Sequence, residues 1–405
     1  MQHPVSITLE EALALVMASV PPATRTETVP LAAALGRVAA APVAARFDLP
    51  PFNCSPLDGY ALRAADSAAA TRAAPALLRV VGTTYAGDAP PGPIGPGEAL
   101  RVMTGAPVPP NADCVARQEV TDEGMETVRL YLAHAPGENL RRAGEELVAG
   151  APLLAPGTRL GPAHLGILST QGLGEVSVYA RPVAGVLSTG SELAVPGAPL
   201  VPGAIYDSNG PMLAARLETL GAKPLRPAPC GDDEAALAEA LGALLESCDI
   251  ALTSGGVSVG QKDLMPQVVR RLGGQILFHG VRMRPGSPVL AAAVRGKPVL
   301  CLPGNPFAAL CAFEVLARPA VDKLCGLAAP GAQRIPVTAQ NAYGKPSNVR
   351  RLVRCRVTGG QAWFPPGGHG STMLAEMATC NALADIPAGA PPVAAGSPLE
   401  VLLLG

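Results

Sequence analysis

Three short apolar runs in this chain each end in a loop of glycine and small polar residues. They span residues 183–187, 250–252 and 299–302. Buried strands that end in this way are typical of the carboxyl edge of an open α/β sheet, where ligands bind. Three such loops on one edge would line a single crevice with free backbone N–H groups. Such a crevice suits an anion or a phosphorylated ligand.

The loops after these runs hold the candidate ligand contacts. The sharpest signal starts at Ser254, but a tight strand-to-helix turn with Asp263 as its N-cap explains that stretch equally well. The sequence has no Walker phosphate loop, dinucleotide-binding Gly-x-Gly-x-x-Gly, hydrolase Gly-x-Ser-x-Gly or histidine pair at metal-ligand spacing. We take as candidate substrate-binding residues Ser188, Thr189, Gly190, Ser254, Gly255, Gly256, Ser258, Pro303, Gly304 and Asn305.

Composition narrows the class of protein. A chain of 405 residues is too long for one core and predicts about two to four domains. The net charge of −1 and the scarcity of aromatic residues argue against nucleic-acid binding. No apolar run of about 18 residues and no signal peptide are present, so we expect a soluble, cytoplasmic protein without a membrane span. The nine cysteines are scattered singly, which argues against zinc and disulfides.

Apolar spacing predicts the helices. Residues 5–20 should form an amphipathic helix with a Thr8–Glu11 capping box, and the Ala-rich residues 26–46 a short helix that ends before a proline. Beyond residue 181, apolar strands alternate with helices, the clearest of which spans residues 233–246 with Asp232 as N-cap. This alternation predicts a doubly wound, mostly parallel sheet.

Two other regions contain short strands between Gly/Pro turns, which predicts small β domains. The first follows residue 46 and opens with a proline-stiffened loop that carries Asp58. The second follows residue 330 and should form a small barrel or sandwich. Its polar loop at residues 367–372 contains Ser371 and is the best candidate there for a contribution to a site.

Several motifs then occur in a distinctive order: Asp48–Phe52 with Ser55–Ala61, Thr104–Pro109, Gly144–Glu146, Ser188–Leu193, Thr253–Gly260 with Asp263, and Leu302–Pro306. Together they resemble the molybdopterin molybdenumtransferase family, the bacterial molybdate-insertion proteins similar to the gephyrin E domain. The resemblance covers essentially the whole chain.

The resemblance implies a multidomain α/β plus β fold in a homodimeric subunit of four domains. Residues 1–46 and 143–181 would form one discontinuous helical domain. Residues 47–142 would form an inserted β domain, whose Asp58 loop reaches toward the partner subunit's crevice. Residues 182–330 would form the α/β molybdopterin-binding domain, and residues 331–405 a β-barrel-like domain.

The implied reaction is the insertion of molybdate into adenylylated molybdopterin, assisted by Mg²⁺, with release of AMP and formation of the molybdenum cofactor. The molybdopterin adenylyltransferase and the proteins that receive the cofactor are the expected protein partners. Asp58, Glu192 and Asp263 are then candidate catalytic residues. Asp232, Asp233 and Asp263 are candidate Mg²⁺ ligands, because hard cations prefer oxygen. Thr104, Arg284, Ser287 and Ser371 complete the candidate substrate-binding set.

Some of these carboxylates have plainer explanations. Glu192 could be a solvated carboxylate at a helix start, and Asp232 and Asp233 precede a predicted helix that they could simply cap. The chain also departs from the family pattern. Where the family usually has Lys-Pro-Gly-Lys, this chain has Arg284-Pro-Gly-Ser287, so one cation is exchanged and one is lost. Lys262 or Arg282 could compensate.

Two other functions stay open on this sequence. The loss of the lysine at position 287 would suit a carrier that binds molybdopterin or the cofactor without inserting metal. The α/β domain alone would suit a molybdopterin adenylyltransferase. The additional β domains and the Asp58 loop favour insertion over both.

Overall fold

The computed structural model describes residues 6–257, 264–367, 370 and 373–404. The chain folds into two compact units. The first contains the chain up to Ala41, residues 156–165 and the chain from Glu175 onward. The second contains Pro42–Ala155 and Gly166–Gly174. The division into four domains remains a prediction. No helix in the described part of the chain is both long and apolar enough to cross a membrane.

The first unit is built around a six-stranded sheet that confirms the predicted mostly parallel arrangement. The three pairings from β13 to β18 are parallel, and β17 and β15 complete one edge with antiparallel pairings. Continuous apolar runs form these strands because both faces of the sheet are covered. In spatial order the strands are β13 (Lys223–Leu225), β10 (Val183–Ser188), β14 (Ile250–Ser254), β18 (Lys297–Leu302), β17 (Leu290–Val294) and β15 (Gln275–His279).

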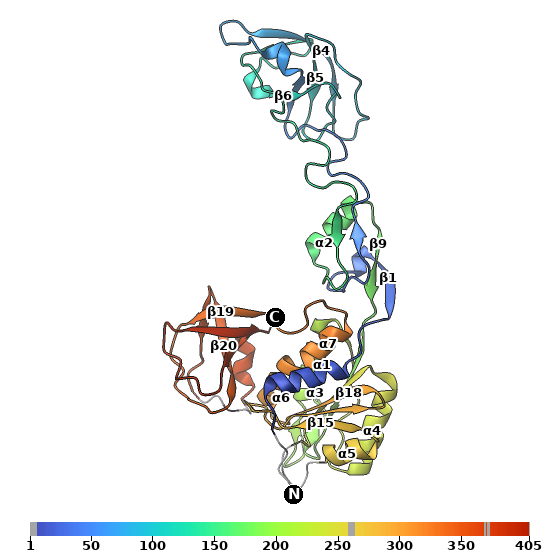
Figure 1. Ribbon diagram of the computed structural model, residues 1–405, viewed down its shortest axis with the longest axis vertical. Coiled ribbons are helices and arrows are strands. Elements are labelled where there is room, and N and C mark those ends of the chain that lie inside the picture. The colour runs from blue at the N-terminus through green and yellow to red at the C-terminus, as the bar shows by residue number, and fades with distance from the viewer. Residues whose placement is uncertain (1–5, 258–263, 368–369, 371–372, 405) are drawn as a thin grey trace. The chain divides into compact units, whose positions relative to one another are not determined.

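Helices cover the two faces of this sheet, as a doubly wound fold requires (Figure 1). One face packs against α1 (Leu9–Ser19), α3 (Asn209–Leu220), α6 (Pro306–Ala312) and α7 (Arg318–Leu324). The other packs against α4 (Glu234–Ser247) and α5 (Met265–Arg271). The predicted capping box of α1 is present. The predicted cap of α4 is wrong by one residue, because Asp233 is extended and its carboxylate accepts the Ala236 N–H.

The helix predicted within residues 26–46 does not form. Residues Thr26–Pro30 make β1, which pairs antiparallel with β9 (Glu175–Tyr179), and only a 3₁₀ turn follows at Leu31–Ala33. Further on, β2 (Val43–Ala44) pairs with β8 (Pro152–Leu154). Residues Thr26–Pro30 contain no alanine and end in a proline, so their own preference for a helix is weak, and pairing with the distant strand β9 decides their structure.

The C-terminal strands form a second sheet in the first unit. Its order is β16-β20-β21-β19-β23-β22, and an additional pairing of β20 with β22 closes it into the barrel predicted for this region. In sequence, β16 lies between β15 and β17, which belong to the central sheet. The strands are β16 (Met283–Arg284), β19 (Arg334–Ala339), β20 (Arg350–Thr358), β21 (Gln361–Trp363), β22 (Ala382–Ile386) and β23 (Pro398–Leu403).

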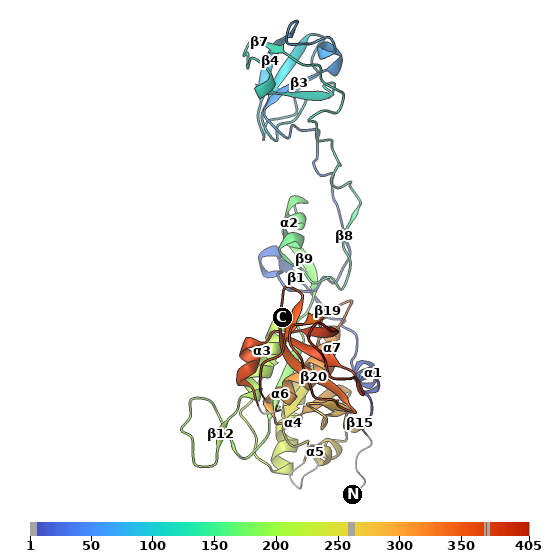
Figure 2. The same ribbon diagram turned by 90° about the vertical axis from the view of Figure 1, so that its left-hand side faces the viewer.

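The second unit contains a five-stranded sheet with apolar clusters on both faces, and its strands confirm the β runs predicted there. Figure 2 shows three of these strands, β3, β4 and β7. The order is β6 (Cys114–Arg117), β3 (Gly59–Leu62), β5 (Glu98–Val102), β4 (Ala76–Thr84) and β7 (Thr127–Leu130). Helix α2 (Pro162–Thr170) follows β8 along the chain, and the boundary between the two units falls within it.

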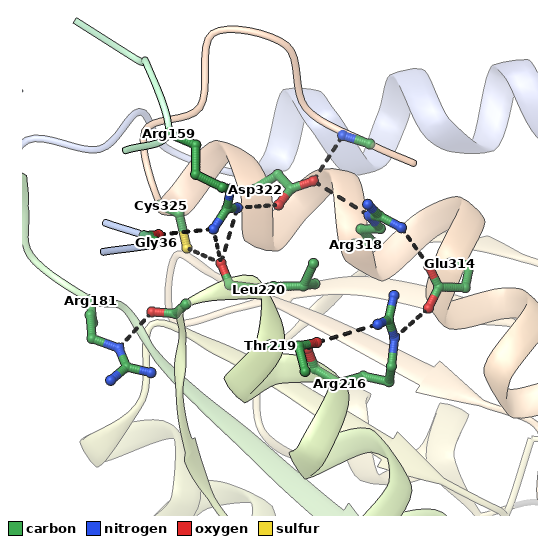
Figure 3. Close-up of polar contacts among 12 residues, drawn as sticks. Gly36, Arg159, Arg181, Arg216, Thr219, Leu220, Glu314, Arg318, Asp322 and Cys325 are labelled. Atoms are coloured by element: carbon green, nitrogen blue, oxygen red, sulfur yellow. Dashed lines mark hydrogen bonds and ion pairs between the residues drawn. The ribbon is translucent and has the colours of Figure 1, made fainter. Parts of the chain in front are cut away.

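A buried ionic network supports the helices of the first unit (Figure 3). A π-helical segment, Phe313–Ala317, joins α6 to α7 and carries Glu314. The Glu314 side chain is fully buried and accepts hydrogen bonds from Arg216 Nε at 2.7 Å and Arg318 Nη1 at 3.1 Å. Burial raises the pKa of nearby Asp322, against the Gly331 N–H and the neighbouring guanidiniums, which lower it.

Removal of the Glu314 carboxylate should therefore destabilise the first unit. In Glu314→Ala two guanidiniums lose their buried partner, which should lower the free energy of unfolding by about 3–5 kcal/mol. Thermal unfolding followed by circular dichroism should show a midpoint several degrees lower. Glu246→Ala is the matched control, because Glu246 forms an exposed pair with Arg295 and should change the midpoint little. Equal midpoints for the two variants would show that the buried network adds no stability.

Candidate active site

The three glycine loops meet at the carboxyl edge of the central sheet, as the sequence predicts. They follow β10, β14 and β18, which are consecutive parallel neighbours in the sheet. Between them lies a crevice of about 690 Å³. The predicted residues that line it are Thr189, Gly190, Glu192, Asp232, Ser254, Gly255, Gly256, Pro303, Gly304 and Asn305.

Close backbone approach explains the glycine after β14. Gly255 has a positive φ of 104°, and a Cβ atom there would lie 2.4 Å from the Thr189 carbonyl oxygen. Only glycine accepts both the conformation and the contact. The Gly255 N–H donates to the Leu302 carbonyl at 3.0 Å, and the Thr189 N–H donates to the Ser254 carbonyl at 2.8 Å. The loops are thus fixed to one another by backbone groups.

Asn209, the first residue of α3, and Asp207, just before the helix, complete this scaffold. The sequence predicts that the helix start at Asn209 favours an anion, but it does not identify Asp207 as part of the site. The Asn209 amide donates to Ser254 Oγ at 2.6 Å and to the Gly304 carbonyl at 2.7 Å, so it joins two loops. Asp207 accepts from Ser188 Oγ at 2.9 Å and from the Gly210 N–H at 2.9 Å. Its position three residues before Gly210, in the first turn of α3, is a recognisable capping signal. The contacts of Asn209 have no such local signal.

The same contacts show what the Ser188 side chain does. Ser188 is 2% exposed and donates its hydroxyl to Asp207. It is not among the side chains that line the crevice. Its contribution is therefore to hold Asp207 at the start of α3, whereas the next residue, Thr189, faces the crevice.

The carboxylates of the first unit divide into two groups. Glu192 is exposed and lines the crevice together with Asp232, which accepts the Ser191 N–H at 3.3 Å. Asp233 instead caps α4 and does not line the crevice. Glu192 lies at the base of the excursion that carries β11 (Leu193–Ala194) and β12 (Ile205–Tyr206), seen in Figure 2. Asp263, Ser258 and Ser371 lie outside the described residues.

A second cavity, of about 320 Å³, adjoins the first and shares Pro288, Pro303 and Asn305 with it. Arg284 and Ser287 line this second cavity, so the loop with the altered cation pattern borders it. Of the two cations expected to compensate for Ser287, Lys262 lies outside the described residues. Arg282 is exposed and lines neither cavity.

Asp58 and Thr104 belong to the second unit and contact each other. The Thr104 N–H donates to Asp58 Oδ1 at 2.7 Å, and the Thr104 hydroxyl donates to the same oxygen at 2.8 Å. Both bonds stabilise the ionised carboxylate and so hold the pKa of Asp58 below its ordinary value. The bond from the Thr104 N–H has the larger effect. Asp58 is therefore an anion at neutral pH, and its oxygen is fixed by the loop that contains Thr104.

The sequence of the whole chain is similar to those of known proteins of one family. A Mycobacterium tuberculosis protein named molybdopterin molybdenumtransferase 2 is 39% identical over 396 residues, which cover 95% of this chain and 97% of that protein. A Staphylococcus aureus molybdopterin molybdenumtransferase is 34% identical over 379 residues, covering 93% of this chain and 90% of its own. The chain belongs to the molybdopterin molybdenumtransferase family.

The family assignment extends along the whole chain. Residues 7–172 match the family region described as MoeA N-terminal region (domain I and II), and residues 336–404 match MoeA C-terminal region (domain IV). Residues 185–323 match a region described as probable molybdopterin binding domain. A crystal structure of the molybdopterin biosynthesis moeA protein from Pyrococcus horikoshii OT3 has a TM-score of 0.86 at 28% identity, covering 98% of this chain and 100% of that one. The multidomain α/β plus β fold is thus that of the molybdopterin molybdenumtransferases.

The contact between Asp58 and Thr104 can be tested by titration. Thr104→Val removes the hydroxyl donor and leaves the N–H donor, so the pKa of Asp58 should rise toward its ordinary value without reaching it. Because the pKa is depressed, the contact is present at neutral pH and is lost as the pH falls through that pKa. Carbon-detected NMR titration of the Asp58 carboxyl measures the change. An unchanged pKa would mean that the hydroxyl does not bind Asp58 in solution.

Proposed function

We propose that this protein inserts molybdate into adenylylated molybdopterin, with release of AMP and formation of the molybdenum cofactor. The observation that carries the proposal is the crevice of three glycine loops, in a chain that matches molybdopterin molybdenumtransferases over more than nine-tenths of its length. The crevice is lined by glycine loops and by the carboxylates Glu192, Asp207 and Asp232, so a ligand with phosphates and a dithiolene would need a cation beside it.

The reaction has two parts that must balance. Two Mo–S bonds form between molybdate and the dithiol, and one oxo group leaves as water with the two thiol protons. Addition of water splits the phosphoanhydride, so that AMP leaves and the pterin keeps its phosphate. The protein must therefore offset repulsion between anions, accept and return protons, and hold both ligands close together.

The described residues supply these roles. Backbone N–H groups of the three loops and the guanidinium of Arg284 offset the negative charge of phosphate and molybdate. Glu192 lines the crevice and can accept or position a proton. Asp58 is held ionised by Thr104 and can act in the same way in a crevice that it reaches. Carboxylates repel molybdate, so they serve the proton and the metal instead.

The crevice also suits Mg²⁺. Mg²⁺ prefers oxygen ligands and binds through one or two carboxylates together with substrate phosphates. Glu192 and Asp232 provide two carboxylates that line the crevice, and Asp263 follows the glycine loop after β14 in sequence. Asp233 is a weaker candidate, since its carboxylate caps α4. Bound there, the ion would make the phosphoanhydride easier to split by neutralising charge on the leaving phosphate.

A homodimer and a cytoplasmic location are also part of this proposal. Asp58 and Thr104 belong to the second unit, and Glu192 and Asp232 to the first. In the proposed dimer the Asp58 loop of one subunit completes the crevice of the other. The molybdopterin adenylyltransferase that makes the substrate and the proteins that receive the product are the proposed partners.

A carrier that binds the pterin without inserting metal is the second candidate, and Ser287 favours it. Ser287 borders the smaller cavity with a neutral hydroxyl where the family usually has an ammonium. Insertion is tested with full-length protein, adenylylated molybdopterin, Mg²⁺ and molybdate, followed for AMP and cofactor. A carrier releases neither product, and an adenylyltransferase is recognised in a parallel assay by its consumption of molybdopterin and ATP.

Glu192 should be needed for turnover and not for folding. Glu192→Gln keeps the shape of the side chain and removes its charge, so turnover should fall by about tenfold or more, as is typical for a lost acid/base group. Asp263→Asn should behave in the same way. Glu218→Gln is the control, because Glu218 is an exposed carboxylate on α3 outside the crevice. Full activity in both Glu192→Gln and Asp263→Asn would remove these residues from the mechanism.

The proposed dimer predicts complementation. A heterodimer of one Asp58→Asn subunit and one Glu192→Gln subunit should regain part of the activity that each homodimer lacks, because one of its two crevices is intact. Differently tagged subunits allow the heterodimer to be purified and assayed for AMP release. If a verified heterodimer stays inactive, Asp58 acts within its own subunit or has no role in turnover.

A further inference from the structure

Two arginines lie side by side at the smaller cavity. β16 pairs in parallel with β20, and in that register Arg284 is the direct partner of Arg351. Both residues line the cavity of about 320 Å³. Neighbouring strands lie about 4.8 Å apart, so the two side chains leave the backbone close together. The sequence did not indicate this arrangement, since the two residues belong to different predicted domains.

Neither of these arginines forms an ion pair with a carboxylate of the described residues. Other arginines of β20 do form such pairs: Arg350 pairs with Asp385, and Arg354 pairs with Glu376. Like charges directly opposite on adjacent strands are destabilising. Arg284 and Arg351 thus form a local excess of positive charge beside a cavity, in a chain whose net charge is only −1.

The Arg351 guanidinium is held in place beside the cavity. Its Nη1 donates to the Tyr343 hydroxyl at 2.6 Å, which fixes the direction of the side chain. Its Nε is buried and has no hydrogen-bond partner among the described residues. A buried donor without a partner is unfavourable, and no carboxylate of the described residues pairs with this guanidinium, which lines the cavity.

The smaller cavity includes position 287, where the family usually has a lysine. Ser287 borders it with a neutral hydroxyl, and the cavity continues into the main crevice through Pro288, Pro303 and Asn305. We propose that Arg351 acts as the second cation of an oxyanion site, in place of the ammonium that the family usually has at position 287. The ligand class is a tetrahedral oxyanion, either molybdate or a phosphate of the pterin, and this choice rests on the proposed function.

The test compares charge removal at two positions of the same strand in the full-length protein. Arg351→Gln should weaken oxyanion binding by about ten- to a hundredfold, the range for a lost hydrogen bond to a charged group. Arg356→Gln removes an equal charge from an exposed position of β20 outside the cavity and should leave binding unchanged. Calorimetric titrations with molybdate, inorganic phosphate and AMP at one ionic strength identify the ligand.

A cationic role also predicts rescue, which a purely structural role does not. Ser287→Lys should tighten binding by no more than about tenfold in the wild-type chain, where Arg351 already acts. In the Arg351→Gln background the same change should recover most of the lost affinity. Equal effects of Ser287→Lys in the two backgrounds, or equal affinities of Arg351→Gln and Arg356→Gln, would overturn the assignment. Melting curves confirm that each variant is folded.

Steady-state kinetics test the role of Arg351 separately from the proposed function on which it rests. If molybdate is the ligand, Arg351→Gln should raise the KM for molybdate by about tenfold or more and change kcat by less than about twofold. A wild-type chain that inserts molybdate and an Arg351→Gln variant with the same KM would overturn the role of Arg351 in molybdate binding and leave the function standing. A wild-type chain without turnover, whose phosphate binding still depends on Arg351, would support the site and overturn the function.

Discussion

The close approach of Gly255 to the Thr189 carbonyl determines the character of the site. With no side chain at the contact, the loops after β10 and β14 pack backbone against backbone, and Asn209 holds the loop after β18 against them. The crevice wall is therefore made largely of peptide groups. Peptide N–H groups favour anions without placing many fixed cations beside the carboxylates that the chemistry also needs. A larger side chain at position 255 would separate the loops and remove this property.

Folding and chemistry draw on the same kind of side chain in this crevice. Asp207 and Asp233 accept backbone N–H groups at the starts of α3 and α4, so their oxygens are already used. Glu192 and Asp232 line the crevice, and so does Asp207, whereas Asp233 does not. An aspartate that caps a helix contributes roughly 1 kcal/mol to stability, and moving it onto a metal would forfeit that contribution. Local helix geometry thus decides which carboxylates remain available for protons and metal.

The sequence could predict what depends on neighbouring residues. The capping box of α1 and the glycine loops at the strand ends follow from short-range rules, and the structure confirms them. It could not predict contacts that depend on distant pairing. Thr26–Pro30, the start of the segment expected to form a helix, became β1 because Glu175–Tyr179 pairs with it, and Asn209 joins loops that are far apart in sequence. Even the α4 cap was missed by one residue, since Asp232 and Asp233 differ only in backbone conformation.

The pairing of β16 with β20 is the distant contact that matters most for the site. The segment between β15 and β17 leaves the central sheet and joins the C-terminal barrel, so one cavity receives residues from both. An oxyanion responds to the charge around it and not to the order of residues along the chain. A cation lost at position 287 can therefore be replaced by one on β20, provided that the two strands stay in register. A shift of one residue would turn Arg351 to the other face of its strand, so the barrel's register becomes part of the anion site.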